Sequence, residues 1–586
     1  MNKKAIFFSP HVNIWVHAFP EALVAETLAD QGYSVTIVGC RGLLSQRCTT
    51  FNTLGVRGVI SPQLRKKTCN QCISKQRKLD KHICFHRLWL DDFLTEQDIK
   101  DVDNEIGDKD TPILRQSEYL GIPVGHLASY ETILTYKKLD HSFVQDELVE
   151  YKSNLRGCML ALRGFKKILV EEQNVSFLFT YNSLYSVNRS VTLFAETRGI
   201  KTYSLHGGNH AVNRYNTLII ARKNQVIHTH HLISLWTQFA CIPCSHQAAT
   251  SVTDHILEIF RGRDPWAYST PLGQPIDIRE RFKIKPNQKI LLATMSSYDE
   301  QFAAESIGLS FDKGKILFDS QASWIEWLIK YMTSRHDLFL VIRVHPREFP
   351  NKREKRLSEH AQKLSSQFKN LPENVVVNWP TDNFSLYNLL TEVDVILNAW
   401  SSVGKEASML GLPVVLYSSN SQFVNYPTSL NFVGDSLEAY KKAIESALAQ
   451  GWSFERIRYS YRWLALEQVY SVLDISDSFS PYVNKHGFSK FFLKKVQRVL
   501  NIDTHLYEDC KRRSRPLRQG YMVAQMLQYD KCSIADVNSI PETSLEQETQ
   551  SLIIEIKRIL NFIDLKDRSA SPLLQAIHRF LECQVT

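Results

Sequence analysis

The stretch 394–417 constrains the fold of this chain more than any other segment. Residues 395–397 form a short apolar run of the kind found in buried parallel strands. Ser401 and Ser402 follow as favourable N-cap residues, and Gly411 stands where a short helix would end. A further apolar run comes next, so the segment predicts strand, turn, helix and strand. This repeat is typical of α/β sheets, in which ligands bind beyond the carboxyl ends of the strands.

The turn at Ser401 and Ser402 predicts an anion site. The free N–H groups at the start of a helix, the helix dipole and two hydroxyl groups all favour a phosphate there. The simpler interpretation is that the serines only cap the helix. Glu406 argues for a ligand, because the acid of a capping box would stand at Gly404 or Lys405 instead. We therefore expect Glu406 to bind a ribose hydroxyl.

Polar residues also end an earlier apolar run. The buried strand expected in 338–348 ends at His345 and Pro346, with Arg343 and Arg347 beside this turn. Polar groups therefore cluster a second time at the carboxyl end of a strand.

A third polar turn follows a turn-rich join around residues 269–286. The run 289–295 predicts the first strand of a second domain, and it leads directly into Ser296 and Ser297. In a doubly wound sheet this turn would lie beside the one at Ser401. An ordinary β–α turn would have the same composition.

The order and spacing of the His-Pro and Ser-Ser pairs, over residues 285–450, resemble bacterial surface-polysaccharide glycosyltransferases of the two-domain GT-B type. That group includes capsule-synthesis transferases, bacterial sialyltransferases and the glycerophosphate polymerases of teichoic acid synthesis. The resemblance implies that the His-Pro turn contacts the nucleotide of a CMP- or CDP-activated donor, that the Ser-Ser turn holds its phosphate, and that the acid after it meets the ribose. The predicted donor-binding residues are Ser296, Ser297, Arg343, His345, Pro346, Ser401, Ser402, Lys405 and Glu406.

The N-terminal half predicts a Rossmann-like domain of its own. It opens with a strand over 5–8, a helix over 16–29 and a strand over 35–39, and further strands are expected at 177–181 and 202–205. A G-x-G-x-x-G motif does not follow the first strand, which argues against a dinucleotide-dependent dehydrogenase. The predicted fold class is α/β, with two Rossmann-like domains facing a cleft and a helical C-terminal extension. The predicted ranges are 1–270, 285–455 and 456–586.

His206 is the predicted catalytic base. It follows an expected strand and precedes two glycines, and this segment resembles the His-Gly segment of the glycerophosphate polymerases. Inversion at an anomeric carbon needs a group that takes the acceptor proton, and a histidine with a pKa near ~6.5 suits that role. A structural role for His206 is the alternative, with His210, Asp299 and Glu300 as other candidate bases.

We expect the chemistry to need no divalent metal. The Ser-Ser turn, aided by Arg343 or Lys405, would stabilise the departing phosphate. The sequence Asp101-Val-Asp103 has the letters of an Asp-x-Asp metal site but lies in a polar, helix-like segment.

Four cysteines raise a separate possibility. Cys40, Cys48, Cys69 and Cys72 have the spacing C-x7-C-x20-C-x2-C, and four thiolates can hold a structural zinc ion or an iron–sulfur cluster. The alternative is four free buried thiols. Further cysteines and histidines complicate the pairing: His82, Cys84, His86, Cys241 and Cys244.

Composition suits a large soluble enzyme, because 586 residues with 44% hydrophobic and 22% charged side chains can form two or three domains. The absence of a long apolar run predicts a cytoplasmic protein. The segment 485–518 carries ten Lys or Arg against three acids. It predicts either a solvated helix or a contact with the inner membrane face or an assembly protein. The net charge of +9 is modest, and nucleic acid is not an expected partner.

The predicted function is an inverting glycosyltransferase that moves a sugar from a nucleotide-activated donor onto a growing capsule or lipopolysaccharide glycan. A CMP-sugar is the favoured donor and a UDP-sugar the alternative, with a lipid-linked or oligosaccharide acceptor. A CDP-alditol phosphotransferase is the rival enzyme. A non-catalytic scaffold that binds a nucleotide or glycan is the alternative of another class.

Overall fold

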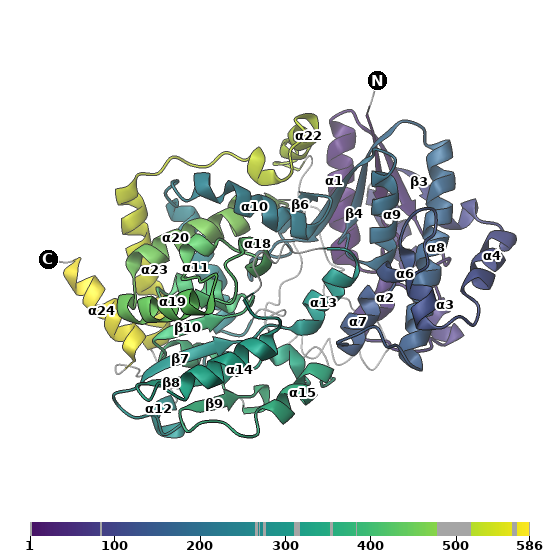
Figure 1. Cartoon of the computed structure of the whole chain (residues 1–586). Helices are drawn as coiled ribbons and strands as arrows, with labels where there is room; N and C mark the ends of the chain where they lie inside the picture. The colour runs from purple at the N-terminus through teal and green to yellow at the C-terminus, as the bar shows by residue number, and fades with distance from the viewer. Residues whose placement is uncertain are drawn as a thin grey trace, which may run out of the picture.

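The chain folds into two α/β lobes that face each other (Figure 1). The computed structural model describes residues 3–82, 85–263, 268, 270–273, 277–309, 317–351, 355–382, 384–477, 517–564 and 571–584. Each lobe is built on one sheet, and the predicted pair of Rossmann-like domains is therefore confirmed.

The first lobe contains a seven-stranded sheet with the order β12-β6-β5-β4-β1-β2-β3. Its strands are β1 Lys4–Phe8, β2 Ser34–Gly39, β3 His86–Trp89, β4 Val175–Tyr181, β5 Lys201–Gly207, β6 Thr217–Arg222 and β12 Val472–Asp474. The strands from β5 to β3 pair in parallel, whereas β6 is antiparallel to both of its neighbours. The sheet therefore keeps the parallel core that the sequence predicts.

Helices cover both faces of this sheet because successive side chains of a strand point to opposite faces. Phe7 packs with helix α1 (Trp15–Asp30), while Phe8 packs with α8 (Asp146–Glu171) on the other face. The other helices of this lobe are α2 Thr49–Thr53, α3 Pro62–His82, α4 Glu96–Ile106, α5 Thr111–Arg115, α6 Val124–Leu127, α7 Tyr130–Tyr136 and α9 Ser186–Glu196. Both faces of the β1 strand are thus fully buried.

The second lobe contains a five-stranded, fully parallel sheet with the order β11-β10-β7-β8-β9. Its strands are β7 Lys289–Thr294, β8 Leu338–Arg343, β9 Val375–Asn378, β10 Val395–Asn398 and β11 Val414–Leu416. Its helices are α12 Ile278–Arg281, α13 Tyr298–Ser306, α14 Gln321–Met332, α15 Glu359–Gln367, α16 Leu386–Leu390, α17 Val403–Met409, α18 Ser421–Val424, α19 Leu437–Gln450 and α20 Phe454–Ala465. The predicted succession of strand, turn, helix and strand across residues 394–417 is confirmed.

The two lobes exchange segments of chain. Helices α10 (Gln225–Phe239) and α11 (His246–Phe260) follow the first sheet in sequence but pack into the core of the second lobe. The C-terminal part does the reverse, because β12 pairs with β6 and α22 (Tyr521–Gln528) packs against α1. The remaining helices, α23 (Leu545–Asp564) and α24 (Pro572–Cys583), return to the second lobe beside α11. The predicted helical C-terminal extension thus packs against both lobes.

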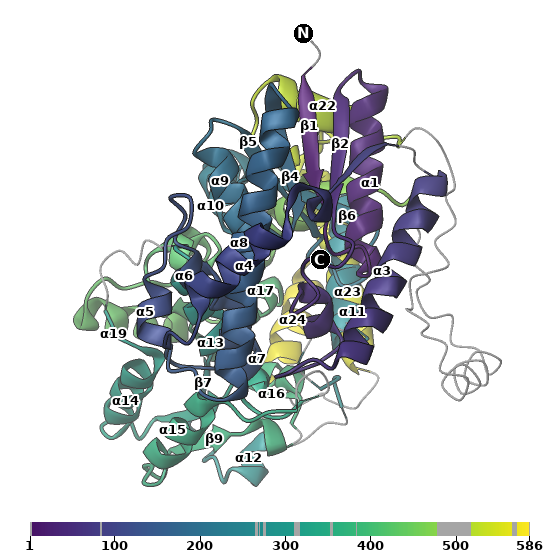
Figure 2. The same cartoon turned by 90° about the vertical axis from the view of Figure 1, so that its right-hand side faces the viewer.

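The excursion between the second strand and residue 90 contains more structure than the sequence predicts. Helix α3 lies alongside α1 (Figure 2), and β3 then adds an edge strand that the sequence does not predict. An edge strand pairs on one side only, so β3 needs no continuous apolar run; its side chains are half-buried or exposed. This difference explains why apolar patterning misses it.

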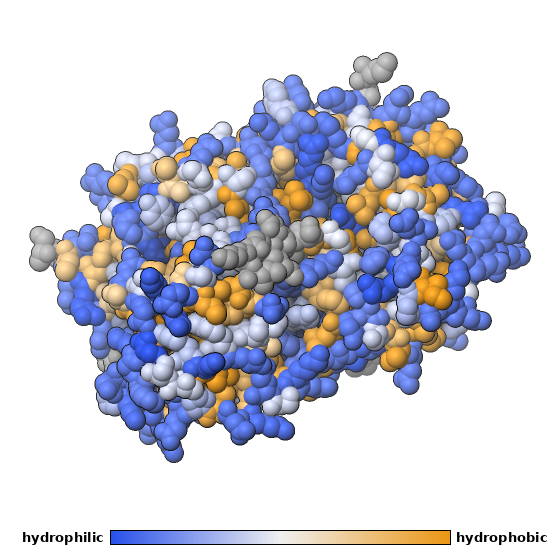
Figure 3. Space-filling view, viewed as in Figure 1, coloured by the Kyte–Doolittle hydropathy of each residue, from blue (hydrophilic) through white to orange (hydrophobic). Residues whose placement is uncertain are grey.

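Within the described residues, the helices are too short or too polar to span a bilayer. The face seen in Figure 3 is mostly hydrophilic, with apolar residues in scattered patches. Apart from Leu517 and Arg518, the basic segment 485–518 lies outside the described residues, so its role stays a prediction.

Candidate active site

A cavity of about 580 Å³ lies at the carboxyl ends of the second sheet's strands. Its wall includes all nine residues that the sequence predicts for donor binding: Ser296, Ser297, Arg343, His345, Pro346, Ser401, Ser402, Lys405 and Glu406. They come from the turns after β7, β8 and β10, which parallel pairing aligns at one edge. Another part of the wall comes from the first half of the chain: Asn209, His255, Ile256 and Ile259.

The Ser-Ser turn is tied to Glu406 through side chains. Ser402 is the N-cap residue of α17, yet its hydroxyl donates to Glu406 Oε1 at 2.9 Å. The Tyr387 hydroxyl donates to the other carboxylate oxygen at 3.1 Å. Ser401 Oγ is 3.4 Å from the N–H of Val403. The Glu406 carboxylate therefore holds the turn through the hydroxyl of Ser402 and does not form a capping box with the backbone.

Two cationic side chains contribute to the wall. Lys405 pairs with Glu467 at 2.8 Å, and both residues line the cavity. Arg343 is buried and donates to Asn378 and to the carbonyl of Phe384. Burial lowers the pKa of Arg343 to about 10, so the guanidinium keeps its charge at neutral pH.

His345 presents a fixed hydrogen-bond donor. Its Nδ1 accepts the backbone N–H of Arg347 at 3.2 Å, which leaves the proton of the neutral ring on Nε2. Burial lowers the pKa of His345, so this neutral form persists at neutral pH. The edge of Tyr268 packs against the ring, with 5.8 Å between centroids.

Arg347 does not line the cavity itself, but it contacts the lining residues Tyr268 and Glu300. It forms a buried ion pair with Asp299 at 2.8 Å and donates to the Tyr268 hydroxyl at 2.9 Å. Asp299 is thereby engaged by an arginine, and the cavity wall includes its neighbour Glu300 instead. Of these two candidate bases, only Glu300 lines the cavity.

The Ser296–Ser297 turn is also held in place. Gln321 exchanges two hydrogen bonds with the backbone of Ser296, at 2.7 and 3.0 Å. Ser297 precedes α13 and donates through its hydroxyl to Glu300. The predicted neighbourhood of this turn and the Ser401 turn is observed in the cavity wall.

His255 is a cavity residue that the sequence does not single out. Its Nδ1 accepts the N–H of Ala211 at 2.9 Å, and burial lowers its pKa well below 6.5. The neutral ring therefore carries its proton on Nε2 and can donate to a ligand. His255 belongs to α11, which lies in the first half of the sequence but packs into the second lobe. Its place in the cavity wall therefore depends on tertiary packing, and no sequence motif marks it.

Both ring nitrogens of His210 form hydrogen bonds with the surrounding backbone. Its Nε2 donates to the carbonyl of Ser251 at 2.7 Å, while Nδ1 accepts the N–H groups of Val212 and Asn213 at 3.1 and 3.2 Å. This pattern favours a structural role over a role as the base.

His206 stands at the end of β5 and does not line the cavity, although Asn209 three residues later does. Its Nδ1 donates to the carbonyl of Gly207 at 2.8 Å, so the lone pair is on Nε2. Burial, with a further contribution from Arg214, lowers the pKa of His206 to about 4. The ring lies 6.0 Å from that of Tyr181, on which His17 stacks at 4.0 Å.

The predicted metal ligands all belong to the first lobe. Cys40 follows β2, Cys48 precedes α2, and Cys69 and Cys72 lie on α3. Over the described part of the chain, no group of three or more His, Cys, Asp or Glu side chains is arranged around a single metal position. Zinc binding stays a prediction. Cys244 instead belongs to the core of the second lobe.

Comparison with known proteins gives distant matches. No protein-family model matches the chain, and no curated protein matches it. Similar solved structures include a putative UDP-N-acetylglucosamine 2-epimerase from Listeria monocytogenes, with 11% identity over 86% of this chain and 98% of that chain and a TM-score of 0.25. The β-Kdo 2,4 transferase KpsC of Thermosulfurimonas dismutans shares 15% identity over 50% of this chain and 80% of that chain, with a TM-score of 0.31. The spinosyn rhamnosyltransferase SpnG shares 10% identity over 79% and 95%, with a TM-score of 0.23. Similarities this distant do not identify the activity.

Proposed function

We propose that this protein is an inverting, metal-independent glycosyltransferase. It transfers a sugar from a nucleotide-activated donor, a CMP-sugar in preference to a UDP-sugar, to a lipid-linked or oligosaccharide acceptor of a bacterial capsule or lipopolysaccharide glycan. One observation carries the proposal: three motifs that are far apart in the sequence contribute all of their predicted donor-binding residues to one cavity.

The cavity suits a nucleotide-sugar in size and chemistry. Its volume of about 580 Å³ falls within the roughly 300–1,000 Å³ of small-molecule sites. The hydroxyls of Ser401 and Ser402 and the charges of Arg343 and Lys405 would face the phosphate. Glu406 would accept a hydrogen bond from the ribose, in addition to those from the two side chains that already hold it.

In the proposed reaction, an acceptor oxygen attacks the anomeric carbon from the side opposite the nucleotide. The new C–O bond forms as the bond between the anomeric carbon and the phosphate oxygen breaks, and the phosphate keeps the electron pair. The acceptor proton would move to Nε2 of His206, which carries a lone pair at neutral pH. Because His206 itself does not line the cavity, the acceptor would meet it beside Asn209, which does. The Nε2–H groups of His345 and His255 would donate to the charge that develops on the donor.

Thermal unfolding with CMP, CDP, UDP, GDP and ADP tests the donor. A nucleotide at a hundred times its Kd adds about 2.7 kcal/mol to the free energy of unfolding. Selective stabilisation by CMP, weaker for 2′-deoxy-CMP, is the expected result. Preference for UDP would indicate a UDP-sugar as the donor, and no response to any nucleotide would contradict the proposal.

Product analysis then tests the reaction. The protein is incubated with CMP-sugars and oligosaccharide acceptors, and the new linkage is determined by mass spectrometry and NMR. A glycosidic bond of inverted configuration is expected. A phosphodiester formed from a CDP-alditol would identify the rival phosphotransferase, and nucleotide binding without turnover would identify a scaffold.

A further inference from the structure

A second cavity, the side pocket, has a volume of about 120 Å³ and adjoins the cavity of the proposed donor site. Three residues line both cavities: Gln301, Trp400 and Phe423. Six aromatic side chains line the side pocket: Tyr298, Phe302, Phe318, Trp400, Tyr417 and Phe423. A ligand in the donor cavity therefore borders on a second, strongly aromatic space.

Four of these rings pack together into one aromatic wall. The Trp400 ring lies 5.7 Å from that of Tyr417 and 5.2 Å from that of Phe423, measured between centroids. Tyr417 also packs on Phe318 at 5.7 Å, and its hydroxyl donates to the carbonyl of Phe318 at 2.6 Å. The face of an aromatic ring carries negative charge and attracts the C–H groups of a saturated ring. A flat sugar ring is therefore a suitable ligand for this wall.

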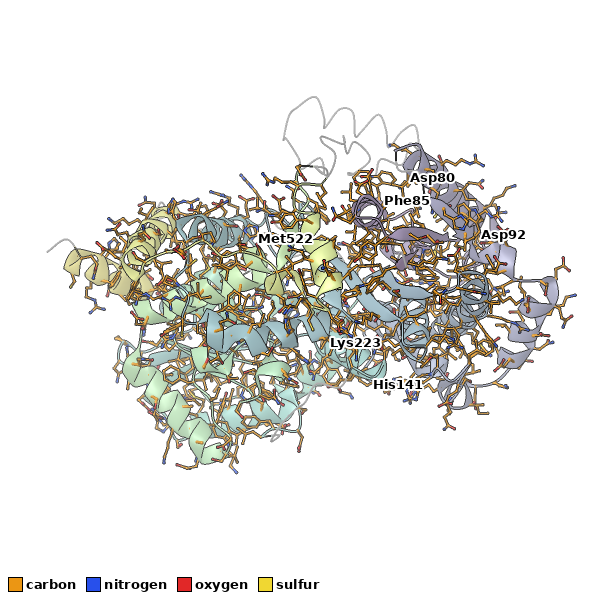
Figure 4. All side chains as sticks on the ribbon, turned by 90° about the horizontal axis from the view of Figure 1, so that it is seen from above. Asp80, Phe85, Asp92, His141, Lys223 and Met522 are labelled. Carbon is orange, nitrogen blue, oxygen red and sulfur yellow. The ribbon has the colours of Figure 1, made fainter. Side chains whose placement is uncertain are left out.

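Helix α13 supplies the other two rings. Tyr298 and Phe302 are four residues apart, so they share one face of the helix, and their rings stack at 6.0 Å. Phe302 also packs on His141 of the first lobe at 4.9 Å, and Nε2 of His141 lies 3.0 Å from Ser306 Oγ. Figure 4 labels His141, which lies where the two lobes meet. This part of the side pocket is therefore held in place by contacts with the first lobe.

The charged lining of the side pocket is acidic. Glu305 and Asp319 line it, whereas none of the described Lys, Arg and His residues does so. Glu305 accepts a hydrogen bond from Gln301 Nε2 at 2.9 Å, but a carboxylate has about four acceptor positions. Hydroxyl groups of a ligand can use the others, while a ligand with its own carboxylate would meet like charge. The side pocket thus favours an uncharged ligand that is rich in hydroxyl groups.

The strand order places the side pocket beyond the phosphate turn. Because the order is β11-β10-β7-β8, the turns at His345, Ser401 and Tyr417 follow one another along one edge of the sheet. Neighbouring strands are about 4.8 Å apart. The His345 and Ser401 turns are thus two strand spacings apart, and the Tyr417 turn lies one spacing further on. A nucleotide that spans the first two turns would leave the side pocket to another group.

The volume of the side pocket matches one sugar ring. A water molecule needs roughly 10–15 Å³ of such space, so a volume of about 120 Å³ has room for about ten groups of that size, and a hexose has roughly twelve non-hydrogen atoms. A whole nucleotide is too large for it.

We propose that the side pocket binds one uncharged sugar ring, whose C–H face packs on the aromatic wall and whose hydroxyl groups donate to Glu305 and Asp319. The proposed function offers two sources of such a ring, the transferred sugar and a sugar of the acceptor glycan. Sugar binding requires only the side pocket, while its part in the transfer rests on the proposed function.

Free methyl glycosides test the sugar site without any nucleotide. The full-length protein is titrated, with saturation-transfer NMR as the readout, with the methyl glycosides of glucose, galactose, mannose and N-acetylglucosamine and with those of glucuronic and galacturonic acid. At least one uncharged glycoside should bind, with an affinity about tenfold or more above that of the uronic acids. Equal or tighter binding of a uronic acid would overturn the proposal, and so would the failure of every uncharged glycoside to bind.

A charge reversal at an exposed position locates the site. Asp319 is exposed and lines the side pocket but not the donor cavity. Asp319→Lys should raise the affinity for the uronic acid glycosides about tenfold or more and leave the Kd for CMP within about twofold. The control is Asp435→Lys, at an exposed position that lines neither cavity. A sugar preference equal to that of the control would overturn the proposal. A Kd for CMP raised about tenfold would overturn it too, because the side pocket would then hold the base.

Steady-state kinetics of Asp319→Lys identify the source of the ring. A higher KM for the activated donor alone would assign the side pocket to the transferred sugar, and a higher KM for the acceptor alone would assign it to the acceptor glycan. Unchanged KM values for both substrates would overturn its part in the transfer. Glycoside binding without any detectable transfer would leave the sugar site standing and remove the proposed function instead.

Discussion

The two walls of the cavity differ in how they are encoded. The wall from the second lobe is assembled from turns at neighbouring strand ends, and its nine predicted residues all reach the cavity. The wall from the first half relies on a loop residue and on α11, which no motif marks. The predicted base, His206, is not a residue of either wall, and its ring lies near Tyr181. The part of the wall proposed to bind the donor thus follows local sequence rules, whereas the part from the first half of the chain depends on long-range packing.

The largest expected effect separates chemistry from donor binding. His206→Gln should lower kcat by about 10²–10⁴-fold, because a positioned general base contributes that much, and should leave the Kd for the nucleotide unchanged. Kinetics and nucleotide titration of the same preparation measure both quantities. The control is His246→Gln at an exposed position on α11. A kcat equal to that of the control would remove His206 from the mechanism.

The second effect concerns a contact between the two lobes. Arg347 pairs with Asp299 in the second lobe, reaches the carbonyl of Leu134 at 3.5 Å and accepts a hydrogen bond from Lys137 through its own carbonyl. Arg347→Met leaves the Asp299 carboxylate buried and unpaired, which should reduce the free energy of unfolding by about 3–5 kcal/mol. Urea denaturation measures the loss.

Two controls sharpen this experiment. Arg335→Met removes the partner of two exposed carboxylates, Asp337 and Glu445, whose side chains are 60% and 51% exposed, and should cost at most about 1 kcal/mol for each pair. Adding Asp299→Asn to Arg347→Met should recover part of the loss. Equal losses for the Arg347 and Arg335 variants would show that burial adds nothing to the contribution of the Arg347–Asp299 pair to stability.

A third effect tests the donor wall directly. Replacing Ser401 and Ser402 together by alanine removes two hydroxyl groups of about 0.5–1.5 kcal/mol each, so the Kd for the nucleotide should rise roughly five- to 150-fold. Calorimetric titration measures this change. The control is the exposed Ser365–Ser366 pair on α15, replaced in the same way. An unchanged Kd would assign the Ser-Ser turn to helix capping alone.

The smallest expected effect is a shift in the pH dependence of kcat/KM. Burial lowers the pKa of His206 from 6.5 to about 4. Because the neutral ring is the active form, kcat/KM should persist as pH falls through 6.5 and decline only as it approaches about 4. The pH–rate profile measures this limb, with circular dichroism at each pH to confirm the fold. A midpoint near 6.5 would indicate a different base, with Glu300 as the remaining cavity candidate.

Much of the fold could be predicted because apolar runs and turn residues are local signals. The strands that became β1, β2, β4, β5, β7, β8, β10 and β11 all overlap their predicted ranges. The edge strand β3 was missed, since pairing on one side demands little apolar character. Arg347 shows why the role of a residue near the site could not be predicted from its position alone. It directly follows the His-Pro turn in sequence, but its guanidinium pairs with Asp299 and does not line the cavity.

The sequence by itself determined the two α/β units and the turns that meet at the donor cavity, because strand period, helix capping and parallel alignment act over short stretches of chain. Only the tertiary structure decided the rest. It carried α10 and α11 into the second lobe and β12 back to the first, and it brought His255 into the cavity wall. These arrangements follow from which buried surfaces fit together, and that complementarity between distant segments has no local pattern in the chain.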